Sequence, residues 1–167
     1  MDVCAATADD EKFLLDLLNT TPVIDGVHTD ALPDLAGSAQ WLSDHDVAAT
    51  EQEWATLVDA RASLQAVIRG DAAPTELHRF LSNVQLAPTM TADGVQWRLD
   101  GANGAARAVL AWDGLRITSP GRLRPCANTE CHLFLIDRSK PNTARWCSMA
   151  ICGNRMKARR HYQRSRG

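Results

Sequence analysis

The sequence predicts an α+β protein: a mainly helical N-terminal domain with a β-hairpin, followed by a small cysteine-rich module. Three observations predict this fold class. Apolar residues recur at helical spacing in the first half of the chain. The pattern then changes to strand-like runs around an Asp93-Gly94 turn. Finally, four of the five cysteines lie between residues 126 and 152.

Length and composition are those of a globular protein. The 167 residues suffice for one ordinary domain, or for a medium domain with a small appendage, and 45% of them are hydrophobic. No apolar run approaches the roughly 20 residues that cross a bilayer, and the acidic N-terminus lacks a signal-peptide layout. We therefore expect a cytoplasmic protein without a membrane partner. Thiols stay reduced in the cytoplasm, which favours metal binding by the clustered cysteines over disulfides. Cys4 is expected to be a free thiol.

The first two predicted helices have clear start signals. Thr7 is a suitable N-cap, with Asp10 in the capping-box position, for an amphipathic helix that ends at Asn19. Asn19 is expected to cap this helix rather than to touch a ligand. A loop is expected over residues 22–33, and a second helix over residues 34–44.

The third helix has the strongest pattern. Thr50-Glu51-Gln52-Glu53 has the sequence of a full capping box, and Gly70 is expected to end the helix. One stripe recurs at helical spacing along it: Trp54, Leu57, Val58, Arg61, Leu64 and Ile68. Such a stripe predicts core packing rather than a cofactor site. Pro74 suits the first turn of a fourth helix.

A β-hairpin and one more helix complete the first domain. Residues 84–90 and 95–99 flank the turn and predict the hairpin, and residues 105–112 return to helical composition. Thr118-Ser119-Pro120-Gly121 is the best domain boundary. We therefore expect one domain over residues 1–120 and a second over residues 121–167.

The net charge of −2 conceals a division of charge along the chain. Residues 1–121 carry 7 Lys and Arg against 18 Asp and Glu, a net −11. Residues 122–167 carry 11 Lys and Arg against 2 Asp and Glu, a net +9. A segment this positive would attract a polyanion, and nucleic acid is the obvious partner. The alternative is a basic surface that docks on the acidic first domain.

The chain carries two close cysteine pairs, fifteen residues apart: Cys126, Cys131, Cys147 and Cys152. Tetrahedral zinc sites are built from such pairs, each supplying two thiolates from one tight turn. Four thiolates close the coordination shell, so we expect one structural Zn²⁺ ion and no catalytic position. An iron–sulfur cluster is the alternative. His132 and His161 are expected to be bystanders rather than ligands.

The order of elements around these cysteines predicts a treble-clef-like finger. Residues 133–136 are strand-like, residues 137–142 supply turn residues, and residues 145–147 return as the second strand of a hairpin. A helix follows Cys152, and the positive end of its dipole would stabilise this thiolate. A module this small needs the metal to fold, and structural zinc contributes about 10–16 kcal/mol.

Cys152-Gly153-Asn154-Arg155 spells CGNR. With residues 145–149 before it and the basic tail after it, the module resembles the CGNR zinc-finger family. The preceding region resembles the ABATE domain at residues 15–20 and at Trp41-Leu42. This family comprises bacterial proteins described as transcription regulators, so the resemblance implies zinc binding by the four cysteines and a role on DNA. One departure is the turn at residues 141–144, which lacks the usual arginines and is not expected to grip phosphate.

The helix after Cys152 presents cations on two nearly opposite stripes. Few of its residues suit packing, so we expect it to project from the finger. Nucleic-acid contacts are expected from Arg145, Arg155, Lys157, Arg159, Arg160, Arg164 and Arg166. Gly153 is expected to give the backbone room beside the metal. Asn154 and Arg155 either orient the thiolates by hydrogen bonds or contact DNA.

The leading hypothesis is a DNA-binding transcription regulator. Two alternatives are a protein-interaction or autoinhibitory module and a thiol redox switch, neither of which binds DNA directly. The sequence contains no HExxH, GxSxG or Rossmann fingerprint, and we do not expect an enzyme. A second copy of the chain and a small-molecule ligand of the N-terminal domain stay open as further partners.

Overall fold

The computed structural model describes residues 6–24 and 26–165. The elements of these residues are α1 (Ala8–Leu18), β1 (Val23–Ile24), β2 (Val27–His28), α2 (Leu35–Asp44), α3 (Glu51–Arg69), a 3₁₀ helix (Pro74–Phe80), β3 (Gln85–Thr91), β4 (Gly94–Asp100), α4 (Gly104–Thr118), β5 (Leu123–Pro125), β6 (Phe134–Ile136), a π-helical turn (Met149–Gly153) and α5 (Asn154–Arg164). Strands pair only two by two, as β1–β2, β3–β4 and β5–β6, all antiparallel. The predicted α+β class is confirmed.

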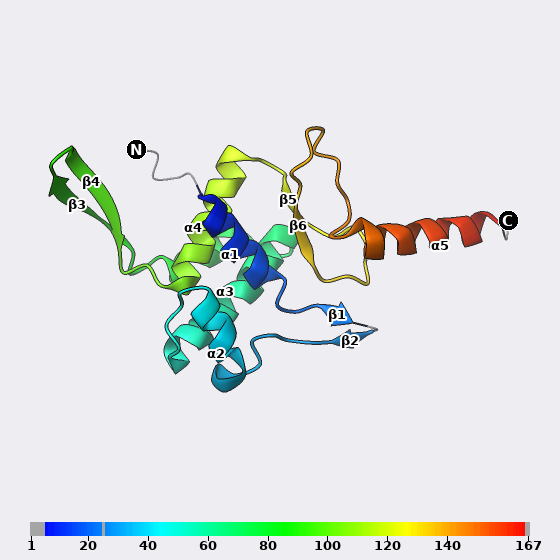
Figure 1. The fold of residues 1–167 in the computed structure, drawn as a ribbon, viewed down its shortest axis with the longest axis horizontal. Coiled ribbons are helices and arrows are strands. Elements are labelled where there is room, and N and C mark those ends of the chain that lie inside the picture. The colour runs from blue at the N-terminus through cyan, green and yellow to red at the C-terminus, as the bar shows by residue number, and fades with distance from the viewer. Residues whose placement is uncertain (1–5, 25, 166–167) are drawn as a thin grey trace.

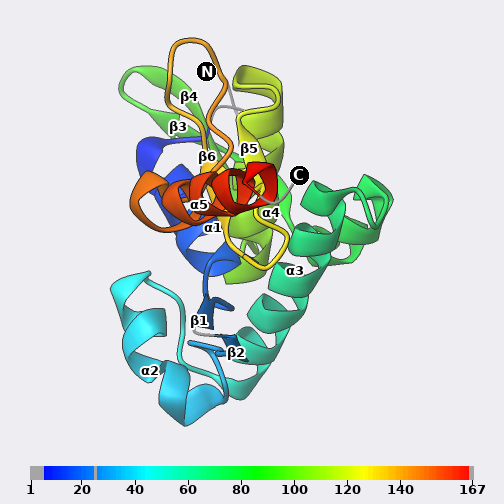
Figure 2. The ribbon, with the colours of Figure 1, turned by 90° about the vertical axis from the view of Figure 1, so that its right-hand side faces the viewer.

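Helices α1, α3 and α4 form the centre of the molecule (Figures 1 and 2), and α4 packs against both of the others. Small buried side chains on α4 allow this close approach: Ala105, Ala108 and Ala111. Asn103 caps α4 by accepting the N–H of Ala106 at 2.8 Å. The helix is longer than the predicted 105–112 segment because its buried face continues through Leu115.

The predicted helix starts are largely confirmed. Thr7 and Asp10 form the expected capping box of α1. At α3, Thr50 accepts the N–H of Glu53 at 3.2 Å, but the Glu53 carboxylate is used elsewhere. It accepts the N–H of Gly104 at 2.6 Å and so ties the start of α3 to the start of α4. Gly70 ends α3 in the left-handed conformation, at φ +85°.

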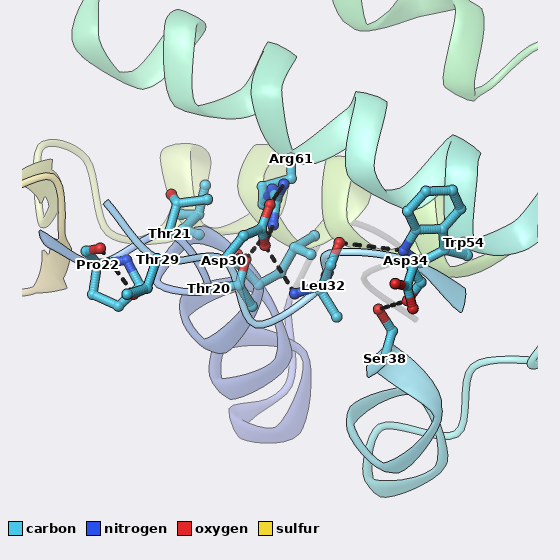
Figure 3. Close-up of polar contacts among 12 residues, drawn as sticks. Thr20, Thr21, Pro22, Thr29, Asp30, Leu32, Asp34, Ser38, Trp54 and Arg61 are labelled. Atoms are coloured by element: carbon cyan, nitrogen blue, oxygen red, sulfur yellow. Dashed lines mark hydrogen bonds and ion pairs between the residues drawn. The ribbon is translucent and has the colours of Figure 1, made fainter. Parts of the chain in front are cut away.

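The segment between α1 and α2 is tied to α3 by polar contacts (Figure 3). The predicted loop over residues 22–33 contains the short β1–β2 hairpin. Arg61, which the sequence places in the apolar stripe of α3, is 6% exposed. Its guanidinium donates to both Asp30 carboxylate oxygens, at 2.6 and 2.8 Å, and to the Thr20 hydroxyl at 2.8 Å. A buried ion pair therefore positions this segment.

The strands of the C-terminal module pair differently from the sequence-based expectation. We expected residues 133–136 to pair with residues 145–147, but β6 pairs with β5, Leu123 opposite Ile136. Strand β5 leads directly into Cys126, whose N–H donates to the Leu133 carbonyl at 2.9 Å and closes the loop between the strands. The loop that follows β6 folds back on Asp137 and does not form a hairpin. The Asp137 carboxylate accepts the N–H groups of Ser139 and Ala144 at 2.8 and 2.7 Å.

Phe134 joins the C-terminal module to the helical core. Its side chain is 1% exposed and belongs to the same apolar cluster as the residues of α1, α3 and α4. The Asn19 side chain pairs with its backbone: Phe134 N–H donates to Oδ1 at 2.7 Å, and Nδ2 donates to the Phe134 carbonyl at 3.2 Å. Asn19 thus caps α1, as predicted, and also binds β6. Arg69 lies over the Phe134 ring, 4.7 Å from its centroid.

Among the described residues, no helix combines the length and the apolar character needed to cross a membrane.

We predict that Arg61→Met destabilises the fold by about 1–3 kcal/mol at neutral pH, since Asp30 loses its cation while partly exposed to water. Partial burial raises the pKa of Asp30, but the hydrogen bonds and charge of Arg61 outweigh it and lower the pKa below 3.8. Because the folded-state pKa lies below the unfolded value, this stabilisation is complete above about pH 4 and is lost as pH falls through the folded-state pKa. Denaturant unfolding between pH 2.5 and 7 measures the difference from wild type.

Arg79→Met is the matched control. Arg79 pairs with Asp59 at 2.7 Å, but both side chains are more than half exposed. Its replacement is expected to cost under about 0.5 kcal/mol. Equal losses of unfolding free energy in the two variants would show that the Arg61–Asp30 pair stabilises the fold no more than an exposed ion pair does.

Candidate functional site

The structure brings the four clustered cysteines to one point. Their Sγ atoms all lie within 4.8 Å of one another: Cys126, Cys131, Cys147 and Cys152. Cys126 follows β5, Cys131 ends the following short loop, and Cys152 lies in the π-helical turn before α5. Residues far apart in the sequence thus converge on a group that could hold a metal ion.

The spacing of the sulfurs fits a tetrahedral metal site. The Sγ atom of Cys147 lies 3.6 Å from that of Cys131 and 3.7 Å from that of Cys152. Four thiolates at a metal–sulfur distance of about 2.3 Å around one ion are about 3.8 Å apart. A disulfide requires about 2.05 Å. The cysteines therefore fit a thiolate-bound metal and not a pair of disulfides.

Asn128 links the two cysteine pairs, a role the sequence reasoning missed. The residue is fully buried, and its amide Nδ2 donates to the Cys152 sulfur at 3.6 Å. Its backbone carbonyl accepts the Cys131 N–H at 2.8 Å. The Cys147 N–H in turn donates to the Cys126 sulfur at 3.5 Å. N–H groups aimed at sulfur stabilise the thiolate form and fix its orientation.

The ionisation of the thiols depends on their surroundings. Burial raises the pKa of Cys131 to about 11. Burial also raises the pKa of Cys147, and hydrogen bonds with Cys131 and Cys152 add to this effect. Burial alone would raise the pKa of Cys152 too, but hydrogen bonds from Asn128 and the neighbouring thiols outweigh it and lower the pKa. A bound cation would lower the pKa of Cys131 and Cys147 and so favour their thiolate forms.

The CGNR residues lie at the start of α5. A Cβ atom at Gly153 would lie 2.9 Å from the Met149 side chain and 3.3 Å from Cδ1 of Trp146, so glycine lets these side chains pack there. The Asn154 side chain donates to the Ala150 carbonyl at 3.3 Å, while the amide that contacts a sulfur is that of Asn128. Arg155 is exposed.

Helix α5 projects from the body of the molecule (Figure 1), and Figure 2 views it nearly end-on. Arg155, Lys157 and Arg164 are exposed and form no ion pair within the described residues. Arg159 pairs with both carboxylate oxygens of Glu130 at 2.6 Å. The predicted projection of this helix is confirmed, and Tyr162 on it is 71% exposed.

The remaining predicted residues differ in where the structure places them. Arg145 is exposed, with its guanidinium 5.3 Å from the centroid of the Trp146 ring. Arg166 and the Arg160 side chain lie outside the described residues, as does Cys4. His132 and His161 are not part of the metal-binding group in the described chain; His132 stacks edge-on against His28 at 4.7 Å.

Comparison with known families agrees with this arrangement. The ABATE family model, described as "Putative stress-induced transcription regulator", matches residues 11–127. The chain belongs to the ABATE family. The CGNR zinc finger model matches residues 122–165 of this ABATE protein, which include all four clustered cysteines. The resemblance seen in the sequence is therefore confirmed. No curated protein matches the chain.

We predict that Asn128→Ala lowers the affinity for Zn²⁺ by about 10–100-fold, because the Cys152 sulfur loses its amide donor. Competition against a chromophoric chelator measures the affinity. Asn154→Ala is the control, since its amide bonds a carbonyl and not a sulfur. A larger loss in the Asn154 variant would assign the orienting role to the CGNR asparagine instead.

Proposed function

We propose that the four cysteines hold one structural Zn²⁺ ion, and that the finger presents α5 to double-stranded DNA in a transcription regulator. The observation that carries the proposal is the placement of α5. It begins two residues after Cys152 and then projects away from the helical body (Figure 1). The side chains of Arg155, Lys157 and Arg164 on it are exposed.

The donor set supports zinc in a structural role. Four thiolates complete the tetrahedral shell, leaving no position for a water molecule or a substrate. Residues 122–167 are too few to fold on an apolar core alone. The ion would fix the turn that starts α5 relative to β5 and β6, so its role is to hold the helix in place.

The charges and dimensions of α5 support DNA as the partner. Residues 122–167 carry a net +9. A helix is about 10–12 Å across, and the major groove is about 12 Å wide, so cations on opposite sides of α5 can reach phosphates on both walls. Such contacts position a protein on the duplex and carry little base information. Arg159 is the weakest candidate because Glu130 already pairs with it.

Autoinhibitory docking of the basic helix has less support. Arg138 of the finger pairs with Glu11 of α1, so part of the finger does bind the acidic domain. However, α5 itself packs against the Met149–Gly153 turn. Among the described residues, its one ion pair is with Glu130 of the finger. Arg155, Lys157 and Arg164 of α5 are therefore available to an external partner.

We predict one zinc ion per chain in purified protein, measured by elemental analysis. Cys152→Ser is expected to lose most of the metal and part of the far-UV helical signal, because α5 follows directly from the bound turn. Cys4→Ser, which alters the cysteine far from the other four in the sequence, is expected to retain both. Full zinc content in the Cys152 variant, or none in the wild type, would contradict the metal assignment.

We predict that DNA affinity falls steeply with salt, with a log–log slope of about −0.9 for each phosphate neutralised. Arg155→Ala, Lys157→Ala and Arg164→Ala are each expected to weaken binding and to reduce the magnitude of the slope by about 1. Fluorescence anisotropy with a labelled duplex measures both quantities.

Arg116→Ala provides the control for this series. Arg116 is an exposed cation on α4, and it pairs with Asp113 on the same helix. The variant is expected to bind DNA as the wild type does. A salt-independent interaction, or equal losses in all variants including this control, would count against DNA binding through α5, whatever the zinc content.

A further inference from the structure

The β3–β4 hairpin carries an apolar face that nothing in the described chain covers. Its register places Leu86 opposite Leu99, Pro88 opposite Trp97 and Met90 opposite Val95. Because side chains alternate along a strand, these three pairs lie on one face. Met90 is 76% exposed and Trp97 49%. The hairpin projects from the helical body at the end away from α5 (Figure 1).

The other face of the hairpin has a different composition. It carries Gln85, Ala87, Thr89, Thr91, Gln96, Arg98 and Asp100. The two faces are thus separated as they are in a sheet that packs on one side and meets water on the other. A two-stranded hairpin on its own is marginally stable in water. Contiguous apolar patches on a protein surface commonly mark interaction sites.

We propose that this face is the contact surface for a second copy of the chain. The apolar face consists of a central Pro88–Trp97 pair with one apolar pair on either side. A two-fold axis through the centre would place the Met90–Val95 pair of one copy over the Leu86–Leu99 pair of the other. Every position would then meet an apolar partner, as an isologous interface requires.

The chemistry of the face also argues against other partners. None of its six side chains carries a charge, so it offers nothing to bind phosphates of nucleic acid or the head groups of anionic lipids. The hairpin's cation, Arg98, belongs to the opposite face and pairs with Asp100 at 2.9 Å. An apolar sheet face of the same shape is the fitting partner, and a second copy supplies one.

The size of the face indicates how tightly two copies would bind. Six side chains that each expose roughly 80 Å² would bury on the order of 1,000 Å² in the two copies together. This area lies below the about 1,200–2,000 Å² of stable specific interfaces and near the about 1,000 Å² expected of a weak, reversible one. The dimer is therefore expected to dissociate in the micromolar range, with Trp97 and Pro88 at its centre as the main contact. Helix α5 lies at the opposite end of each copy, so both basic helices stay accessible.

Sedimentation velocity of the full-length protein over a concentration series tests the proposal. The wild type is expected to shift from monomer to dimer as concentration rises. Met90→Glu and Trp97→Glu are each expected to raise the dimer dissociation constant by roughly 30-fold or more, because a charge enters the apolar contact. Thr89→Glu and Gln96→Glu place the same charge on the opposite face of the same strands and are expected to leave the dimer intact.

Hydrogen exchange keeps the test valid if a substitution merely unfolds the hairpin. In the unaltered chain, the amides of β3 and β4 are expected to gain protection as concentration rises, while those of α3 stay unchanged. A wild type that remains monomeric at several hundred micromolar would overturn the proposal. So would equal dissociation by substitutions on the two faces, or hairpin protection that does not depend on concentration. None of these readouts involves DNA or zinc, so the result is independent of the proposed function.

Discussion

The convergence of four sulfurs is the constraint on which the C-terminal third of the chain depends. The segment from Cys126 to Cys152 contains one short strand, β6, and the start of the π-helical turn, and most of its remaining backbone is irregular. What brings its two ends together is the cysteine group, with N–H donors from Asn128 and Cys147 aimed at sulfur. Burial raises the pKa of Cys131 and of Cys147, and a shared cation would favour their thiolate forms. The direction of α5 is set by the same group, because the helix continues directly from the turn that contains Cys152.

The local signals in the sequence were sufficient to predict most helices. Thr7, Thr50 and Gly70 act within a few residues of themselves, so their roles as caps follow from sequence alone. The metal-binding role of the cysteine pairs could also be predicted, since the spacing of ligands reflects the geometry of a tight turn. The apolar and polar faces of the β3–β4 hairpin follow from the same alternation that predicted its strands.

Contacts between segments that are distant in the sequence could not be predicted from it. Glu53 was expected to complete a capping box, but it binds the Gly104 N–H, 51 residues away. Asn19 and Asn128 are ordinary polar residues in the sequence, and only the fold places one against β6 and the other against Cys152. The predicted strand pairing of the finger was wrong for a similar reason. The choice between residues 123–125 and 145–147 as partner of β6 depends on the backbone bonds that close the loop around Cys126, and these leave no pattern in the sequence.

The burial of Phe134 has a consequence for how this architecture can be divided. The ABATE match ends at residue 127 and the CGNR match begins at residue 122, so the two share β5. Strand β5 pairs with β6, which carries the Phe134 ring into the helical core. A truncation within the shared residues 122–127 would leave a hole where the Phe134 ring sits in one fragment and an exposed aromatic side chain in the other. Gene fusions or deletions that exchange the finger must therefore carry β5 and β6 together with a compatible α1, so the two regions are expected to evolve as a single unit.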